Sequence, residues 1–184
     1  MIPNLTVVAP KDTDEFKEIL RWSVNFERPL AIRYPRSGKR LFSTQKSPIL
    51  LGKWEYLTRE TGAKTTIIAA GERCLTLAME LSKELLETGV KTDVVNARFV
   101  KPLDKELLNN LQTPHVVVLE DNVKQGGLGQ SVVSFIAENN AKIACKIFAY
   151  RDAFIPQGTV CELMSEYGLN KNEIKDYIAS VSLL

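Results

Sequence analysis

The chain has 184 residues, of which 45% are hydrophobic and 25% charged, and its net charge at pH 7 is +2. This composition is typical of a globular protein of one domain or slightly more, and a charge so close to zero gives no reason to expect a nucleic-acid partner. The apolar runs are shorter than the roughly 18 residues of a membrane span, and the amino terminus lacks a signal-peptide core, so we expect a cytoplasmic protein without a membrane partner.

The cysteines and the histidine limit the chemistry that the chain can perform. Cys74, Cys145 and Cys161 are widely spaced, and we interpret them as reduced thiols of a cytoplasmic protein. His115 is the only histidine, at a strand start, so we expect neither a zinc site nor a Ser/His/Asp triad.

The first 36 residues predict a strand, a helix and a second strand. The first strand falls within residues 2–9, Asp12 and Glu15 form a capping pair for the helix, and residues 30–34 form the second strand. About 35 residues are too few for an independent core, so we expect this unit to end a larger domain or to dock on a partner. The predicted inner face of the helix consists of Phe16, Ile19, Leu20 and Val24.

Residues 37–51 are mainly polar and basic and contain a glycine and a proline, which predicts a linker between domains. Basic residues gather just before and inside it, and their spacing alone favours a solvated loop. They are Arg33, Arg36, Lys39 and Arg40.

From residue 52 the pattern predicts a second unit of alternating strands and helices. Residues 53–58 and 65–70 are two β-rich runs separated by a turn at Gly62, which predicts a hairpin and an antiparallel edge strand. The next helix should end at Gly89. Its predicted inward residues are Leu75, Ala78, Met79, Leu85 and Leu86.

Strands at residues 92–96, 116–119 and 144–150 alternate with further helices, the last opened by Asn170 with Glu173. A short helix is also expected after Asp104. This alternation predicts an α/β fold, a three-layer sandwich around a five-stranded mixed sheet with four parallel strands and one antiparallel strand.

The stretch at residues 116–135, VVVLEDNVKQGGLGQSVVSF, is a strand, loop and helix at the centre of this unit. Open α/β sheets place functional groups at the carboxyl ends of their strands, where this loop lies. The glycines could cradle a phosphate at the start of the helix. The sequence does not match the dinucleotide-binding pattern G-x-G-x-x-G, however, so we favour the interpretation that the glycines let the helix pack closely on the strand. We therefore expect an architectural role, with subunit contacts, for Glu120, Asn122, Gly126, Gly127 and Gly129.

Four strings carry a family resemblance: AIRYPRSG (residues 31–38), VVNARFVKPLD (94–104), VLEDNVKQGGLGQSV (118–132) and RDAFIPQGT (151–159). Together they resemble the carboxyl-terminal third of the 1-deoxy-D-xylulose-5-phosphate synthase family, which is transketolase-like and thiamine-diphosphate-dependent. The resemblance covers nearly the whole chain. It implies that residues 1–36 end a pyrimidine-binding domain, 37–51 are a linker, and 52–184 form the transketolase carboxyl-terminal domain.

The resemblance implies a reaction in which pyruvate loses carbon dioxide and its two remaining carbons add to glyceraldehyde 3-phosphate, with thiamine diphosphate and Mg²⁺ as cofactors. The chain lacks the family's GDG…N motif and its glutamate-bearing segment. We therefore expect no catalytic residue, metal site or bound cofactor here, and no activity from this chain alone. The implied partners are the remaining domains of the synthase, in a homodimer.

The resemblance gives one substrate contact to this chain, because the second arginine of the family's RYPR string contacts the substrate phosphate. That residue is Arg36, which follows a strand and Pro35 and so leaves the sheet at a carboxyl end. Arg33 is expected on the opposite face, in a structural ion pair.

Two alternatives remain open on the sequence. The beta subunits of 2-oxoacid dehydrogenases share this terminal domain, although RYPR followed by FIPQGT is closer to the synthase. The chain could also be a stand-alone module that uses its glycine loop to bind an anion or a partner.

Overall fold

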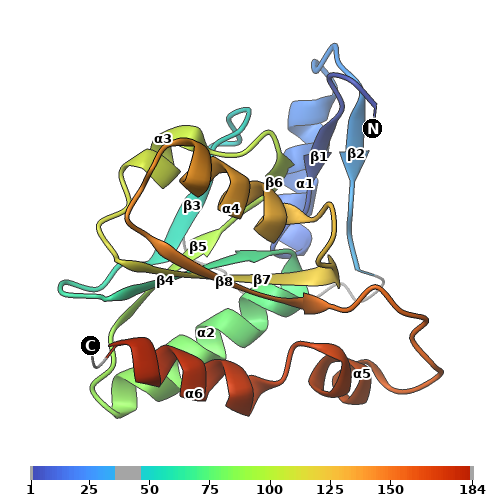
Figure 1. The fold of residues 1–184 in the computed structure, drawn as a ribbon. Coiled ribbons are helices and arrows are strands. Elements are labelled where there is room, and N and C mark those ends of the chain that lie inside the picture. The colour runs from blue at the N-terminus through green and yellow to red at the C-terminus, as the bar shows by residue number, and fades with distance from the viewer. Residues whose placement is uncertain (1, 36–46, 183–184) are drawn as a thin grey trace.

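The computed structural model describes residues 2–35 and 47–182, which contain two β-sheets and six helices (Figure 1). The larger sheet has the strand order β3-β5-β4-β7-β8, and the smaller has the order β2-β1-β6. The strands are β1 (Thr6–Val8), β2 (Leu30–Ile32), β3 (Glu55–Thr58), β4 (Thr65–Ala70), β5 (Thr92–Asn96), β6 (Phe99–Lys101), β7 (His115–Val123) and β8 (Ala144–Tyr150). The helices are α1 (Thr13–Ser23), α2 (Glu72–Glu87), α3 (Lys105–Asn109), α4 (Leu128–Glu138), α5 (Val160–Tyr167) and α6 (Lys171–Ser182).

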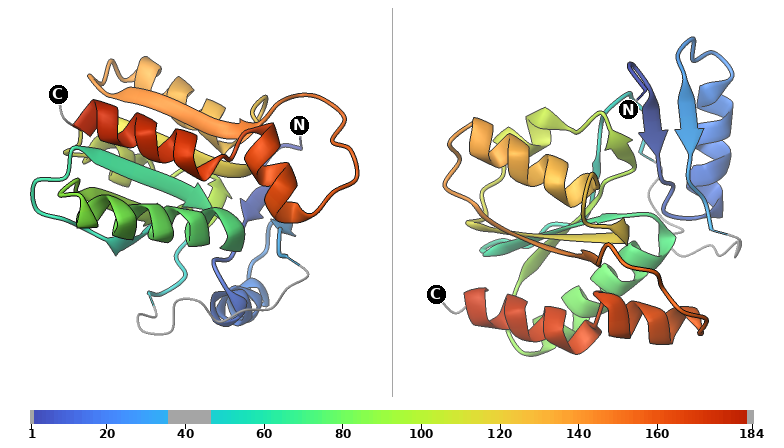
Figure 2. Two further views of the ribbon diagram at one scale, coloured as in Figure 1. Left: turned by 90° about the horizontal axis from the view of Figure 1, so that it is seen from below. Right: turned by 45° about the vertical axis from the view of Figure 1, so that its right-hand side comes forward.

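The larger sheet confirms the predicted α/β architecture. Strands β5, β4, β7 and β8 are parallel to one another, and β3 lies antiparallel at one edge. Helices α3 and α4 cover one face, and α2 and α6 cover the other (Figure 2). Every residue of β4 is buried, as expected for a central strand covered on both faces.

The predicted hairpin is wrong in its pairing. β3 pairs with β5, with Tyr56 opposite Val95, and not with β4, the next strand in the chain. β4 has a parallel neighbour on each side, β5 and β7, so neither of its edges is available and β3 lies at the outside of the sheet. Strand β7 also continues past Leu119 to Val123, because β8 pairs with it there through Tyr150.

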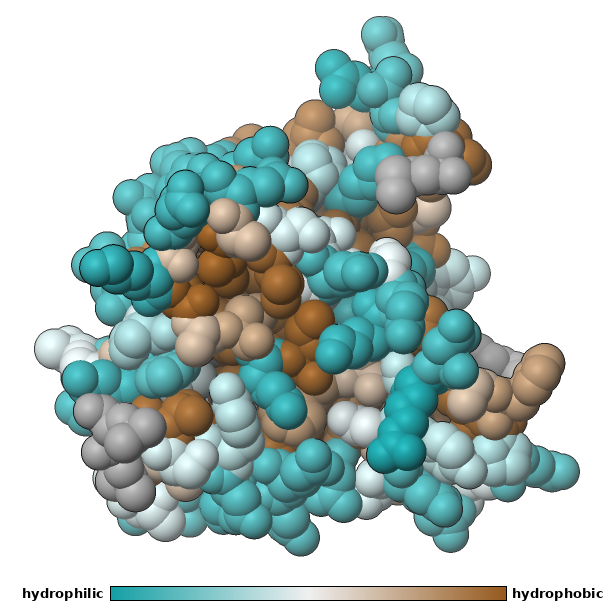
Figure 3. Space-filling view, in the orientation of Figure 1, coloured by the Kyte–Doolittle hydropathy of each residue, from teal (hydrophilic) through white to brown (hydrophobic). Residues whose placement is uncertain are grey.

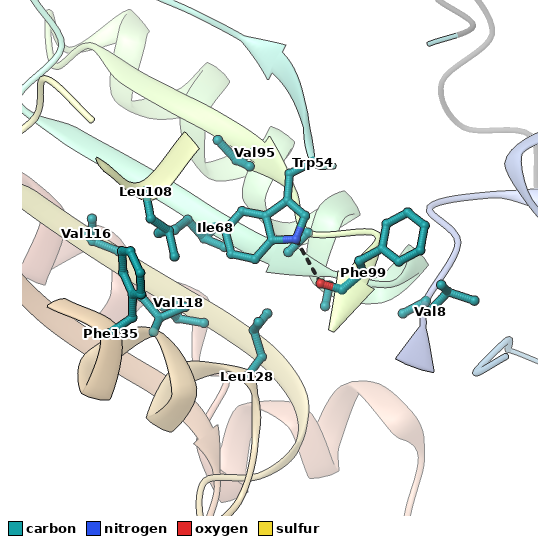
Figure 4. Packing of buried hydrophobic residues seen from close by; sticks show 14 of the residues in the cluster. Val8, Trp54, Ile68, Val95, Phe99, Leu108, Val116, Val118, Leu128 and Phe135 are labelled. Atoms are coloured by element: carbon teal, nitrogen blue, oxygen red, sulfur yellow. Dashed lines mark hydrogen bonds between the residues drawn. The ribbon is translucent and has the colours of Figure 1, made fainter. Parts of the chain in front are cut away.

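The core on the α3 and α4 face is built around the indole of Trp54 (Figure 4). It packs with Ile68 and Val95 of the sheet and with Leu108 of α3. Its Nε1 donates a hydrogen bond of 2.8 Å to the carbonyl oxygen of Phe99, which satisfies its buried polar atom.

The helix caps match the predictions, whereas two of the predicted apolar faces are partly wrong. The Asp12 side chain accepts from the backbone N–H of Glu15, and Gly89 has a left-handed φ of 83° just after α2. Helix α1, however, turns Glu15 and Ile19 inward. This rotation leaves Leu20 and Val24 exposed, at fractions of 42% and 80%, and Leu86 of α2 is also exposed, at 47%.

The smaller sheet is bonded directly to the larger one. β1 pairs in parallel with β2 and antiparallel with β6, and β6 follows β5 after only two residues. Ala97 donates to the carbonyl of Ala69 in β4, and the carbonyl of Arg98 accepts from Ala9 just after β1, both at 2.8 Å. Strand β6, which the sequence did not predict, therefore connects the two units through backbone hydrogen bonds.

None of the helices found in residues 2–35 and 47–182 combines the length and the apolar character that a membrane crossing requires.

The attachment of α6 to α2 should depend on pH. Hydrogen bonds from Lys171 and Lys175 lower the pKa of the Glu84 carboxyl to about 2. A lowered carboxyl pKa stabilises the fold above the ordinary value of 4.5, and this stabilisation is lost as the pH falls toward 2. We expect the protection of the α6 amides against hydrogen exchange, relative to their intrinsic exchange rates, to fall over that range and the effect to disappear in Glu84→Gln. Glu87→Gln, an exposed change on the same helix, should leave it intact.

Candidate functional site

The loop after β7 is held by the Glu120 carboxylate. Glu120 is only 1% exposed and accepts hydrogen bonds from the backbone N–H groups of Leu128 (2.8 Å) and Gly129 (3.0 Å), at the start of α4. Burial raises the pKa of Glu120, and the two N–H donors oppose that rise. These contacts join the strand end to the helix start.

The three glycines of this loop differ in the structural reason that favours glycine at each position. A Cβ on Gly127 would lie 2.4 Å from both Glu120 carboxylate oxygens, and one on Gly129 would lie 2.6 Å from Cγ2 of Ile147 in β8. Gly126 instead has a left-handed φ of 73° and open space around it. Asn122 is half-buried in the last part of β7. The predicted role of the loop in subunit contacts stays a prediction.

A cleft of about 260 Å³ opens where the two units meet, at the carboxyl ends of β1, β2, β4 and β7. Its first wall follows β1 and β2, and its second wall consists of the end of β4, the start of α2 and the last part of β7. The first wall consists of Ala9, Arg33, Tyr34 and Pro35, and the second of Ala70, Gly71, Glu72, Arg73 and Asp121.

Asp121 binds an arginine from each wall. Its carboxylate pairs with Nη1 of Arg73 at 2.9 Å, and its backbone carbonyl accepts from Nη2 of Arg33 at 3.2 Å. Arg33 thus lies in the cleft beside the end of β7. Its position in the sequence alone had not predicted this location. In the first wall, Tyr34 is exposed and its ring contacts Phe16, with ring centroids 4.9 Å apart.

The described lining of the cleft carries two arginines and two acidic residues, so its formal charges balance. Arg36, the predicted phosphate contact, lies outside the described residues, as do Lys39 and Arg40. Pro35, to which Arg36 is bonded, lines the cleft.

Sequence reasoning missed a group of buried charged residues where the two units meet. Arg98 is 1% exposed; its Nε lies 2.9 Å from Oε1 of Glu15, and its Nη2 donates to Glu55. Lys11 also pairs with Glu55, and Asn96 donates to Glu15 at 3.0 Å. Burial raises the pKa of Glu15, and the Arg98 charge opposes this rise. The available signal was a single charged residue, Arg98, inside the largely apolar run of residues 94–100.

A second hollow lies away from this cleft, near the amino ends of β7 and β8. It measures about 450 Å³, and its apolar lining includes Leu111, Phe135, Ile136 and Ile143. An apolar area is visible between α4 and β8 on the face that Figure 3 shows. Among the described residues that line it, Lys142 alone is charged.

In the part of the chain that the structure describes, no three His, Cys, Asp or Glu side chains are grouped so that they could hold a metal ion. The three cysteines are free, and burial raises the pKa of the Cys74 thiol and raises that of Cys145 to about 12. Such thiols are poor nucleophiles near neutral pH.

Comparison with known sequences identifies relatives for nearly the whole chain. The chain is 42% identical over 183 residues to a 1-deoxy-D-xylulose-5-phosphate synthase of Clostridium botulinum (strain Alaska E43 / Type E3), covering 97% of this chain and 29% of that protein. It is 38% identical over 175 residues to the synthase of Clostridium tetani (strain Massachusetts / E88), covering 94% of this chain and 28% of that protein. The chain therefore spans less than a third of the length of these curated relatives.

Solved structures agree with the fold. A split gene transketolase, described as an inactive beta4 tetramer, superposes with a TM-score of 0.89 at 28% identity, over 100% of this chain and 60% of that chain. The transketolase of Campylobacter jejuni gives 0.72 at 18% identity, over 97% of this chain and 26% of that one, a likeness of fold alone. The family described as "Transketolase, C-terminal domain" matches residues 52–174. The chain belongs to the transketolase C-terminal domain family.

Proposed function

We propose that the chain is the carboxyl-terminal part of a 1-deoxy-D-xylulose-5-phosphate synthase, which condenses pyruvate with glyceraldehyde 3-phosphate and releases carbon dioxide. The observation that supports this proposal most is the identity of 42% to such a synthase over 97% of the chain. On this assignment, residues 1–36 end the pyrimidine-binding domain, 37–51 connect the two domains, and 52–184 form the carboxyl-terminal domain.

The cofactor belongs to another part of the enzyme on this proposal. The chain lacks the family's motif for Mg²⁺ and diphosphate, and residues 2–35 and 47–182 offer no metal-holding group. Thiamine diphosphate, where it is bound, supplies the electron sink of the reaction. This chain contributes a wall of the substrate cleft and requires the remaining domains, in a homodimer, for activity. The structural neighbour that consists of beta chains alone is described as inactive, which fits this division.

The cleft between the two units is the proposed position of the aldehyde's phosphate group. Pro35, which directly precedes Arg36 in the sequence, lines its first wall, and Arg33 and Arg73 lie within it. The Asp121 carboxylate pairs with Arg73, and Arg33 donates to the Asp121 backbone carbonyl. Arg33 alone does not match the charge of a dianion, so a further cation is needed. A planar guanidinium can donate two parallel hydrogen bonds to a phosphate, which a lysine cannot. Glu120, next to Asp121 in β7, joins this strand to the start of α4 through its hydrogen bonds with Leu128 and Gly129.

Replacing Arg36 by alanine in the assembled enzyme tests the proposal. We expect the Michaelis constant for glyceraldehyde 3-phosphate to rise at least about tenfold, equivalent to a loss of about 1.4 kcal/mol, with little change in the constant for pyruvate. Arg36→Lys should recover only part of the loss. Arg59→Ala is the matched control, because Arg59 lies over the Tyr56 ring, outside the cleft lining. Equal effects on both substrates, or none on either, would show that another residue binds the phosphate.

A further inference from the structure

We propose that Arg98 is a positioning residue that sets the placement of one wall of the cleft relative to the other. The inference rests on the proposed function for the identity of the ligand, but the geometry on which it depends is independent of that ligand. Arg98 itself does not line the cleft.

The backbone around Arg98 holds both walls. Its carbonyl accepts a hydrogen bond of 2.8 Å from Ala9, which lines the first wall, and Ala97 donates at 2.8 Å to Ala69, which directly precedes the second wall. The next residue, Phe99, pairs with Val8 of β1. The strands that carry the two walls thus meet within the three residues 97–99.

The side chain of Arg98 fixes the elements behind these walls. It binds Glu15 of α1, the helix that follows the Ala9 wall, and Glu55 of β3, in the larger sheet. Its Nη1 also lies 3.4 Å from the carbonyls of Ser47 and Pro48, where the described chain resumes. One side chain therefore contacts the first unit, the larger sheet and the chain segment between them.

The group is neutral as a whole and almost completely enclosed. Lys11 and Arg98 balance Glu15 and Glu55, and all four are at most 8% exposed. A buried charge tolerates little displacement from its partner, because only an opposite charge at close range offsets the free-energy cost of its desolvation. Without Arg98, the Glu15 carboxylate would be left without its cationic partner in that position, and α1 would have to shift to admit water. The wall that includes Ala9, Arg33 and Tyr34 would move with it.

A variant that folds without the ion pair separates positioning from stability. Replacing a buried ion pair by apolar side chains is often neutral for stability, so Arg98→Met/Glu15→Leu should remain folded. Spin labels on unnatural amino acids at Lys17 of α1 and Lys83 of α2, both exposed, report the distance between the units in the isolated chain. Lys171→Met, which removes two exposed ion pairs between α6 and α2, is the control.

We expect a single narrow distance distribution in the wild type and the control, and a shifted or broadened one in the folded double variant. An unchanged distribution in that variant would overturn the proposal. Titration of the same proteins with inorganic phosphate tests the proposed function separately: the wild type should bind it, and the double variant should bind about tenfold more weakly. Absence of phosphate binding by the wild type would count against the proposed function, while the distances would still decide the role of Arg98.

Discussion

Replacing Arg98 by alanine should lower the free energy of unfolding by about 3–5 kcal/mol, the cost of removing one partner from a buried ion pair. The change leaves Glu15 and Glu55, which are 6% and 8% exposed, without their shared guanidinium. Denaturant unfolding of the isolated chain, followed by the fluorescence of Trp22 and Trp54, measures the loss. Trp22 packs edge-on against Phe99 at 5.7 Å between ring centroids, and Trp54 donates to the Phe99 carbonyl, so both indoles report on this junction.

The effect of Arg98→Ala should also depend on pH. Burial raises the pKa of Glu15, so a protonated Glu15 stabilises the fold below its ordinary pKa of 4.5, and this stabilisation declines as the pH rises through the raised value. The destabilisation should therefore be smaller at about pH 4 than at neutral pH. Lys171→Ala, at an exposed pair, should cost at most about 1 kcal/mol at either pH. A loss of under about 1 kcal/mol for Arg98→Ala would mean that the buried group does not depend on the guanidinium.

Replacing Gly127 by alanine should destabilise the chain by about 2–4 kcal/mol, through overpacking and the loss of buried hydrogen bonds. The added Cβ would occupy a point 2.4 Å from the Glu120 carboxylate oxygens. Glu120 would have to move away and release the N–H groups of Leu128 and Gly129. The backbone conformation of Gly127 itself is extended, so the cost comes from the contact and not from φ. Thermal and denaturant unfolding measure it.

Gly126 provides the matched comparison for this prediction. Its φ is 73°, and nothing lies within 4 Å of the point that a Cβ would occupy there. Gly126→Asn should therefore cost no more than about 1 kcal/mol, since asparagine tolerates the left-handed region. Similar losses of stability for Gly127→Ala and Gly126→Asn would show that the position of Glu120 does not require the absence of a Cβ at residue 127.

The sequence predicted most of the larger unit because its signals are local. The apolar run of β7, the helical period from Leu128 and the caps at Asp12 and Asn170 each depend on neighbouring residues only. They suffice for the number, type and order of most elements, and the right-handed crossovers then imply parallel strands. The family resemblance added Arg36, which no spacing argument identified.

The remaining features depend on contacts between distant residues. Nothing local distinguishes β4 from β5 as the partner of β3, because either would bury its apolar face. The role of Arg98 becomes apparent only in the folded chain, where it contacts Glu15 and Glu55, which lie 83 and 43 residues away in the sequence. The same holds for Arg33, whose contact with Asp121 spans 88 residues and defines the cleft.

The most direct test of the proposed synthase function is reconstitution from two polypeptides. The chain is mixed with an amino-terminal polypeptide from a relative such as the Clostridium botulinum synthase, covering the part that this chain does not match. Formation of 1-deoxy-D-xylulose 5-phosphate from pyruvate and glyceraldehyde 3-phosphate is then measured with thiamine diphosphate and Mg²⁺ present. We predict product from the mixture and none from either polypeptide alone. A stable complex that forms no product, or product formed by this chain alone, would contradict the proposed division of the enzyme.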